Sequence, residues 1–315
     1  YLATGTNKKL YVYQNNNWYD ITPTRSTTAG NITGFTTVNV SPTVTITDAG
    51  HGAIEGDFVT ITAVSGAVNG IPAATLENKQ YEIIEVVSTS QYRITATANA
   101  TSTGASAATA TASYEISTNP ATSIAGYGWG AGTWGLSTWN TTRAGLAAPN
   151  SVQLDSGKWS LDTWGEDLLA CQFNGSLYYW DTSASAGTPV AATIVANAPT
   201  SNRFSIVSGT DRHVILFGTQ LIGVSTQDDM FIRWSDQEDH TDWTPTSTNT
   251  SGSQRLTDGS KLITAKRSRG AILVWSDTAL YQMQLIGAPF TFGFSQLGSA
   301  GGAIGLHSAV ESNGN

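Results

Sequence analysis

The stretch LLACQFNGSLYYW, residues 168–180, contains an apolar segment, a short polar turn and an aromatic segment. Short apolar runs bounded by Gly, Asn, Asp or Pro are typical of β-strands. An Asn-Gly pair between two such runs is a strong signal for a tight turn. The stretch is therefore expected to form a β-hairpin.

The same pattern occurs at three other places in the chain. They are YLATGTNKKLYVY (1–13), HVILFGTQLIGVSTQDDMFIRW (213–234) and AILVWSDTALYQM (271–283). The aromatic strands at 176–180, 230–234 and 279–283 are about 50 residues apart, which is the interval of a kelch-like propeller blade. The sequence therefore predicts an all-β protein with β-propeller-like repeated blades.

Composition favours the same fold class and excludes several functions. Only 12% of the 315 residues are charged, 10% are aromatic and 32 are Gly, a mixture that suits strands and tight turns better than helices. The net charge of −8 argues against a nucleic-acid reader with a clustered basic footprint, and against an anionic membrane surface as a partner. Because Cys171 is the single cysteine, an internal disulfide framework and a cysteine metal cluster are excluded.

Residues 30–116 have a different character from the repeats around them. The segments TVTIT, FVTIT, YEIIEVV and QYRITA alternate between apolar and polar residues, which predicts a small inserted β-sandwich or β-barrel domain. The Ala/Thr/Ser run at 95–113 is either a last strand or a flexible return linker. We therefore expect a first propeller segment at 1–29, the inserted domain at 30–116 and the propeller continuation at 117–315. The turn signal at Asn313–Gly314 has no strand after it, so we expect a truncated C-terminus.

Tryptophans are frequent among the glycines of GYGWGAGTWGLSTWN (126–140) and KWSLDTWGEDLLA (158–170). They could form a stacking platform for sugar rings or bases, or they could pack over Gly between adjacent blades. Gly neighbours provide close packing but no hydrogen-bonding partners for sugar hydroxyls, which favours packing. The tryptophans assigned this structural role in blades and turns are Trp129, Trp134, Trp139, Trp164, Trp180, Trp234 and Trp243.

The stretch FIRWSDQEDHTDWTP, residues 231–245, concentrates acidic side chains and invites a chemical interpretation. A calcium-binding EF-hand loop that starts at Asp236 would need Gly and Glu where Thr241 and Ser247 stand. Similarity to the Asp-box of sialidase-type propellers is partial, because Trp243 is present but His240 occupies the glycine position. That motif is itself structural.

A second copy of this pattern favours a structural interpretation. YVYQNNNWYDITP (11–23) shares the aromatic strand, the polar turn, the Trp and the closing Thr-Pro, with Asn15, Asn16 and Asn17 in the turn. A turn that accepts either set of side chains is easier to explain as solvated structure than as chemistry. We therefore expect an acidic residue to cap the turn and Trp243 to fold over the hairpin.

No catalytic, cofactor or metal motif is recognisable elsewhere. A glycosidase needs two carboxylates facing each other, and nothing in the sequence pairs the candidates Asp57, Asp167, Asp236 and Glu238. The histidines His51, His213, His240 and His307 lack metal-ligand spacing. A non-enzymatic protein without a cofactor is therefore expected.

One basic cluster, Lys261, Lys266, Arg267 and Arg269, lies between the strand-like segments LITA and AILVW. Its arginines are expected at a hairpin tip. Such a cluster is either a solvated turn or a contact with another protein or with DNA.

Several of these segments together resemble a structural tail protein of tailed bacteriophages. They include GTNKKLYVYQNNNWYDITP, GYGWGAGTWG, WSLDTWGEDLLA, LYYWD, DRHVILFG, IRWSDQEDHTDWTPTSTNTSG and ILVWSDTALYQMQLIGAPFTFGF, which span most of residues 1–29 and 126–306. The chain is most similar to the nozzle, tail tubular or packaged-DNA-stabilising proteins of short-tailed phages. The segment HGAIEGDFVTITAVSG is similar to small β modules that decorate such virion proteins.

The resemblance implies a virion protein that is made and assembled in the bacterial host cytoplasm. Six copies would form a ring on an adaptor below the portal, contact tail fibre or spike proteins, continue the DNA channel and retain the genome until infection. An acidic subunit suits a channel through which DNA slides, because phosphate binding depends on Lys and Arg. A carbohydrate-binding or glycan-acting β-propeller is the alternative, and another virion role, such as a hub or fibre-attachment protein, is a third expectation.

Overall fold

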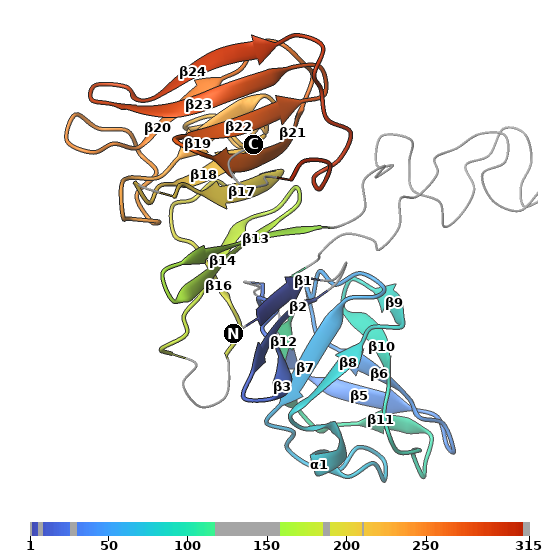
Figure 1. Ribbon diagram of the computed structural model, residues 1–315. Helices are drawn as coiled ribbons and strands as arrows, with labels where there is room; N and C mark the ends of the chain where they lie inside the picture. Colours follow the sequence, from blue (N-terminus) through green and yellow to red (C-terminus); the bar gives the residue numbers. More distant parts are fainter. Residues whose placement is uncertain are drawn as a thin grey trace, which may run out of the picture. The chain divides into compact units, whose positions relative to one another are not determined.

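The computed structural model describes residues 2–5, 9–25, 30–116, 158–184, 190–209 and 211–310. These residues form β-strands joined by turns, together with one short helix, α1 (Ala73–Leu76). The prediction of an all-β, propeller-like fold with a small additional β domain is confirmed (Figure 1). The chain divides into two compact units, one formed by residues 1–21 and 118–315 and the other by residues 22–117.

The described residues of the first unit form four antiparallel sheets in chain order. The first sheet is β1 (Leu2–Gly5), β2 (Leu10–Gln14) and β3 (Asn17–Asp20). The second is β13 (Trp159–Trp164), β14 (Asp167–Gln172), β15 (Leu177–Trp180) and β16 (Thr193–Ile194). The third is β17 (Phe204–Val207), β18 (Val214–Phe217), β19 (Phe231–Trp234) and β20 (Gly252–Arg255). The fourth is β21 (Leu262–Ser268), β22 (Ala271–Ser276), β23 (Leu280–Gly287) and β24 (Thr291–Gly298).

All four predicted hairpins are present. They are β1–β2, β14–β15, β18–β19 and β22–β23, and each contains one of the aromatic strands that revealed the repeat. Asn residues provide the left-handed backbone that tight turns require. Asn15 and Asn16 have φ of 49° and 65° between β2 and β3, and Asn174 has φ of 55° between β14 and β15.

The second, third and fourth sheets stack face to face. Successive side chains of a strand point to opposite faces, and β18 shows the consequence. Val214 and Leu216 join a buried cluster with Leu169 and Cys171 of the second sheet, whereas Ile215 and Phe217 join another cluster with side chains of the fourth sheet. The third sheet is therefore buried on both faces, as a propeller blade is between its neighbours.

The first strands of these sheets also meet in order. β13 contacts β17, and β17 contacts β21. Sequential contact of the first strands of consecutive four-stranded sheets is the arrangement around a propeller axis.

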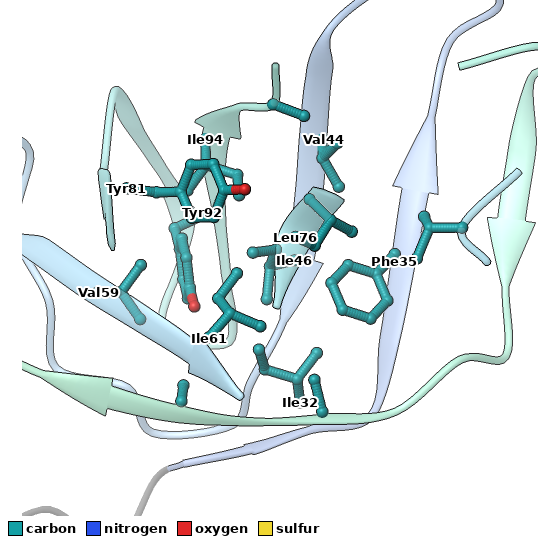
Figure 2. Packing of buried hydrophobic residues seen from close by; sticks show 14 of the residues in the cluster. Ile32, Phe35, Val44, Ile46, Val59, Ile61, Leu76, Tyr81, Tyr92 and Ile94 are labelled. Carbon is teal, nitrogen blue, oxygen red and sulfur yellow. The ribbon is translucent and has the colours of Figure 1, made fainter. Parts of the chain in front are cut away.

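The second unit is a two-layer sandwich. Its five-stranded sheet has the order β11 (Gly104–Ser106), β5 (Gly34–Thr37), β6 (Thr43–Thr47), β10 (Gln91–Thr95) and β9 (Glu85–Ser88). Its four-stranded sheet has the order β4 (Asn31–Ile32), β12 (Ala110–Tyr114), β7 (Phe58–Thr62) and β8 (Lys79–Glu82). Figure 2 shows Phe35, Val44, Ile46, Val59 and Ile61 packing together between the layers.

A polar group is buried beside this apolar core. The Asp48 carboxylate is 1% exposed, and it accepts hydrogen bonds from the Tyr114 hydroxyl at 2.6 Å and from the Gly30 amide at 3.0 Å. Burial is the main cause that raises the pKa of Tyr114 far above its usual value. The hydroxyl therefore stays protonated and keeps donating to Asp48.

Two sequence-based expectations can be compared with these units. The boundaries of the second unit, residues 22 and 117, enclose the predicted insert at 30–116. Before residue 30, the backbone of residues 23–25 pairs with residues 114–116, and Arg25 donates to the Gly52 and His51 carbonyls. The Ala/Thr/Ser run at 95–113 is not a flexible linker throughout, because it contains β11 and most of β12.

Candidate functional site

The four residues of the basic cluster are divided between β21 and the positions on either side of it. Lys266 and Arg267 belong to β21 itself, and only Arg269 lies in the two-residue turn before β22. Lys261 directly precedes β21. The expectation that the arginines lie at a hairpin tip is therefore wrong for Arg267, because the strand that begins with LITA continues as far as Ser268, and it agrees with the position of Arg269.

Arg267 connects the first strands of three sheets. Its guanidinium donates to the Val207 carbonyl of β17 at 3.0 Å and to the Asp162 carboxylate of β13 at 3.0 Å. The same carboxylate accepts a hydrogen bond from the Val207 amide at 2.8 Å. One acid and one base therefore join neighbouring sheets along the first strands.

A second side-chain contact reinforces this junction. The Ser205 amide of β17 donates to the Ser160 hydroxyl of β13 at 2.9 Å, and the two hydroxyls lie 3.2 Å apart. Asp162 and Ser160 alternate on β13, so both point from the same face of that strand toward β17. Polar contacts of this kind fix the register between sheets that apolar packing alone leaves adjustable.

The acidic loop after β19 uses its carboxylates to hold its own backbone. Asp236 accepts hydrogen bonds from the Thr250 amide at 2.7 Å and hydroxyl at 2.6 Å. Asp239 accepts from the Thr241 amide at 2.8 Å and hydroxyl at 2.7 Å. Asp242 accepts from the Asn249 side-chain amide at 2.9 Å. These contacts close the loop from both ends.

The pKa directions agree with these hydrogen bonds. Burial raises the pKa of the Asp236 carboxyl, but donation from Thr250 outweighs it, so the pKa lies below its usual value. The Thr241 hydroxyl and amide are the main causes that lower the pKa of Asp239. Both carboxyls are therefore charged acceptors at neutral pH, which strengthens the bonds that they receive.

An aspartate, a histidine and a hydroxyl also meet beside this loop. The Asp211 carboxylate lies 2.6 Å from His213 Nδ1, and His213 Nε2 lies 2.9 Å from Thr250 Oγ1. In a nucleophilic triad the hydroxyl gives its proton to the histidine, whereas the Thr250 hydroxyl donates to Asp236. His213 is also only 1% exposed. The arrangement therefore connects the start of β18 to the acidic loop. The Thr250 hydroxyl is not placed to act as a nucleophile.

Trp243 was expected to fold over its own hairpin, and the structure buries it in a cluster shared by two sheets. It is 1% exposed, lies in the cluster between the second and third sheets, and its indole donates to the His240 carbonyl at 2.8 Å. The buried Arg233 side chain donates to the Trp243 carbonyl at 2.7 Å. His240 stacks on Tyr179 with ring centroids 4.5 Å apart. The loop is thus fastened to the second sheet by aromatic packing.

The remaining predicted residues separate into three groups. Trp164, Trp180 and Trp234 are buried in the sheets of the first unit. Trp129, Trp134 and Trp139 lie outside the described residues. Asp167, a carboxylate candidate, accepts hydrogen bonds from the Tyr179 hydroxyl and the Thr182 amide, while Asp57 lies in the other unit.

Sequence reasoning missed the residues that connect the sheets and the loop. The residues around Asp162, Ser160 and Thr250 form no recognisable sequence motif. A charged residue in the middle of WSLDTW was the available signal for Asp162, since an acid inside a strand between two tryptophans needs a partner when it is buried.

Neither a metal site nor a membrane span is found within the described ranges. They contain no cluster of three or more His, Cys, Asp or Glu side chains placed to hold a metal ion. No helix among them is long and apolar enough to cross a bilayer.

Comparisons with known proteins give little further information. No family model matches the chain, and no curated protein matches it either. Among solved structures, the phage phi92 endosialidase is similar at 14% sequence identity with a TM-score of 0.26. The alignment covers 90% of this chain and 40% of that one.

Proposed function

We propose that this chain is a structural subunit of a bacteriophage tail, in which copies form a nozzle-like ring around the channel through which DNA leaves. The proposal starts from the resemblance of the hairpin and tryptophan segments to tail nozzle proteins. It places the protein in the virion, beside an adaptor ring and tail fibres or spikes, without any catalytic role.

The observation that carries the proposal is the use of the polar side chains. Asp162, Arg267 and Asp236 each take part in contacts that join strands or close a loop, and the candidate carboxylate Asp167 accepts hydrogen bonds from its own sheet and the turn after it. A protein whose charged groups stabilise its own framework is suited to bear load and to contact neighbours. The acidic composition, with a net charge of −8, further supports a channel wall that DNA phosphates do not adhere to.

A glycan-acting propeller would need a different arrangement. Two carboxylates would have to face each other within about 10 Å, close to the first strands that surround the axis. Among the described first strands β13, β17 and β21, Asp162 is the only carboxylate, and it is paired with Arg267. This observation favours the structural role over glycan cleavage.

Gold-labelled antibodies against the first unit, applied to purified phage particles from the source of this chain, test the proposal. We expect labels on the tail axis below the capsid, and copies of the chain in the particle proteome after a high-salt wash. Absence from washed particles, or hydrolysis of host glycans by the isolated chain, would contradict it.

A further inference from the structure

The β23–β24 hairpin extends past the rest of the fourth sheet and ends in an apolar tip. The pairing of β22 with β23 ends at Ile272 and Met283, so the following residues of β23 pair with β24 alone. In this hairpin tip, residues 285–290, Phe290 is 71% exposed, Ile286 57% and Leu285 45%. Three exposed apolar side chains within six residues make this tip a candidate for an interaction site.

The tip is held in place at its base. The Thr291 hydroxyl donates to the Thr250 carbonyl at 2.9 Å. Ile286 packs over Gly293, where an added Cβ would lie 3.1 Å from Ile286. A rigid apolar projection loses little conformational freedom when it binds, which favours association.

The outer face of the same sheet carries a hollow of about 920 Å³. On β22, Ile272 and Val274 point into the core shared with the third sheet, so Leu273 and Trp275 point the opposite way and line the hollow. Ile304 and Val310 also line the hollow, and they are 97% and 87% exposed. The hollow thus presents apolar walls to solvent.

Two lysines line the hollow and bring positive charge to its wall. Lys261 and Lys266 have no ion pair with any residue in the described part of the chain, and the nearby Asp277 carboxylate accepts hydrogen bonds from Ser260. An ammonium group is attracted to the face of an aromatic ring. The hollow is therefore suited to an apolar group that includes a phenyl ring.

The tip cannot enter the hollow of its own molecule. The hollow is lined by β21, β22 and residues of the C-terminal segment, whereas residues 284–287 extend past the last β22 pair and pair with β24. Reaching the hollow would require this pairing to break. A second molecule can offer its tip without such a change.

We propose that the chain associates with copies of itself by inserting the hairpin tip of one copy, led by Phe290, into the hollow of the next. The contact uses two different surfaces, so every open assembly keeps one free tip and one free hollow, at its two ends, until a ring closes. The inference rests on the proposed function in so far as that function requires a ring of copies, and it names the surfaces that would build the ring.

Sedimentation velocity with matched variants tests this arrangement. Phe290→Asp blocks the tip and Ile304→Asp blocks the hollow, and both positions are so exposed that folding should be unaffected, as equal thermal midpoints would verify. We expect wild-type chains to assemble and each variant alone to associate about tenfold more weakly or not at all. An equimolar mixture of the two variants should form a dimer and nothing larger, since one intact tip meets one intact hollow.

The control is Val224→Asp, at a residue that is 51% exposed outside both surfaces, and it should assemble as wild type does. Wild-type chains that stay monomeric at about 0.1 mM, or single variants that assemble normally, would overturn the inference. A different result would also overturn the inference: wild-type protein that does not self-associate but floats with liposomes, while Phe290→Asp does not float. The tip would then bind lipid. The test uses isolated protein, so a negative result says nothing about the location of the chain in phage particles. A negative result in antibody labelling, in turn, does not change the result on self-association.

Discussion

The Asp162 carboxylate of β13 lies 3.0 Å from the Arg267 guanidinium of β21, so an ion pair connects the second sheet to the fourth past the edge of the third. Asp162 is the more buried partner, with 10% of its side chain exposed against 45% for Arg267. Sheets that stack through apolar faces can slide, and this pair, together with the Val207 amide, fixes their relative register.

Substitution at this junction should therefore destabilise the first unit asymmetrically. Asp162→Ala leaves the Val207 amide without its acceptor and should lower the free energy of unfolding by about 2 kcal/mol. Arg267→Ala should cost about 0.5–1 kcal/mol because the half-exposed pair is screened by water. Urea unfolding measures both.

Arg269→Ala provides the matched control, since Arg269 is exposed in the turn next to β21. It should change the free energy of unfolding by less than about 0.5 kcal/mol. Equal losses for Arg267→Ala and Arg269→Ala would refute the assigned role of the junction.

Trp243 should be a major contributor to stability in the first unit. Trp243→Ala removes a fully buried indole between two sheets and should cost about 3–5 kcal/mol. Trp243→Phe keeps most of the apolar contact but loses the bond to the His240 carbonyl, at about 1 kcal/mol. The control is Phe290→Ala, at an exposed aromatic ring, which should hardly change the thermal midpoint of the monomer. A loss of stability as large as that of Trp243→Ala would contradict the role assigned to Trp243.

The acidic loop should respond to substitution as a structural turn does. Asp236→Ala removes the acceptor of two Thr250 donors and should cost about 1–2 kcal/mol, whereas the exposed Glu238→Ala should cost almost nothing. Particles carrying both substitutions should assemble and infect. Normal particles without infectivity would indicate that the loop acts on a ligand.

His240 should make the stability of the first unit depend on pH. Burial lowers the pKa of His240 from its usual 6.5, and this outweighs the opposing effect of Asp239 and Asp167. The unfolded chain therefore binds the proton more readily, so the stabilising contribution is complete above about pH 6.5 and decreases as pH falls toward the lower folded pKa. Thermal midpoints of wild type should drop through this window.

His240→Asn should flatten that part of the profile. The low pKa values of Asp236 and Asp239 act in a separate window, because their contribution is present above about pH 4 and is lost at more acidic pH. A wild-type midpoint that is constant between pH 7 and about 5 would show that His240 titrates equally in both states.

The repeat of hairpins was predictable because it depends on local sequence. Asn174–Gly175 and the aromatic strand after it define β14–β15 without reference to the rest of the chain, and the same holds for β22–β23. A structural role for Trp243 was predictable for a similar reason, since a large apolar ring next to a polar turn is stabilised by packing against the hairpin. Alternation likewise located the strands of the second unit.

Contacts between distant strands could not be predicted. Asp162 and Arg267 are 105 positions apart, and the sequence alone does not reveal which sheets become neighbours. Arg267 was expected at a hairpin tip because of its charge, whereas it lies in β21 and reaches the Val207 carbonyl while its side chain stays 45% exposed. The interaction of Thr250 with Asp236 and His213 could not be predicted either, because it depends on how the loop folds back on β18.

The central claim, that this is a structural subunit of a phage tail, is tested most directly by cryo-electron microscopy of purified particles from the source of the chain. We expect a ring of copies on the tail axis below the portal, with the stacked sheets of the first unit fitting the density and a central channel wide enough for DNA. Particles whose tail density has no place for these sheets would contradict the claim.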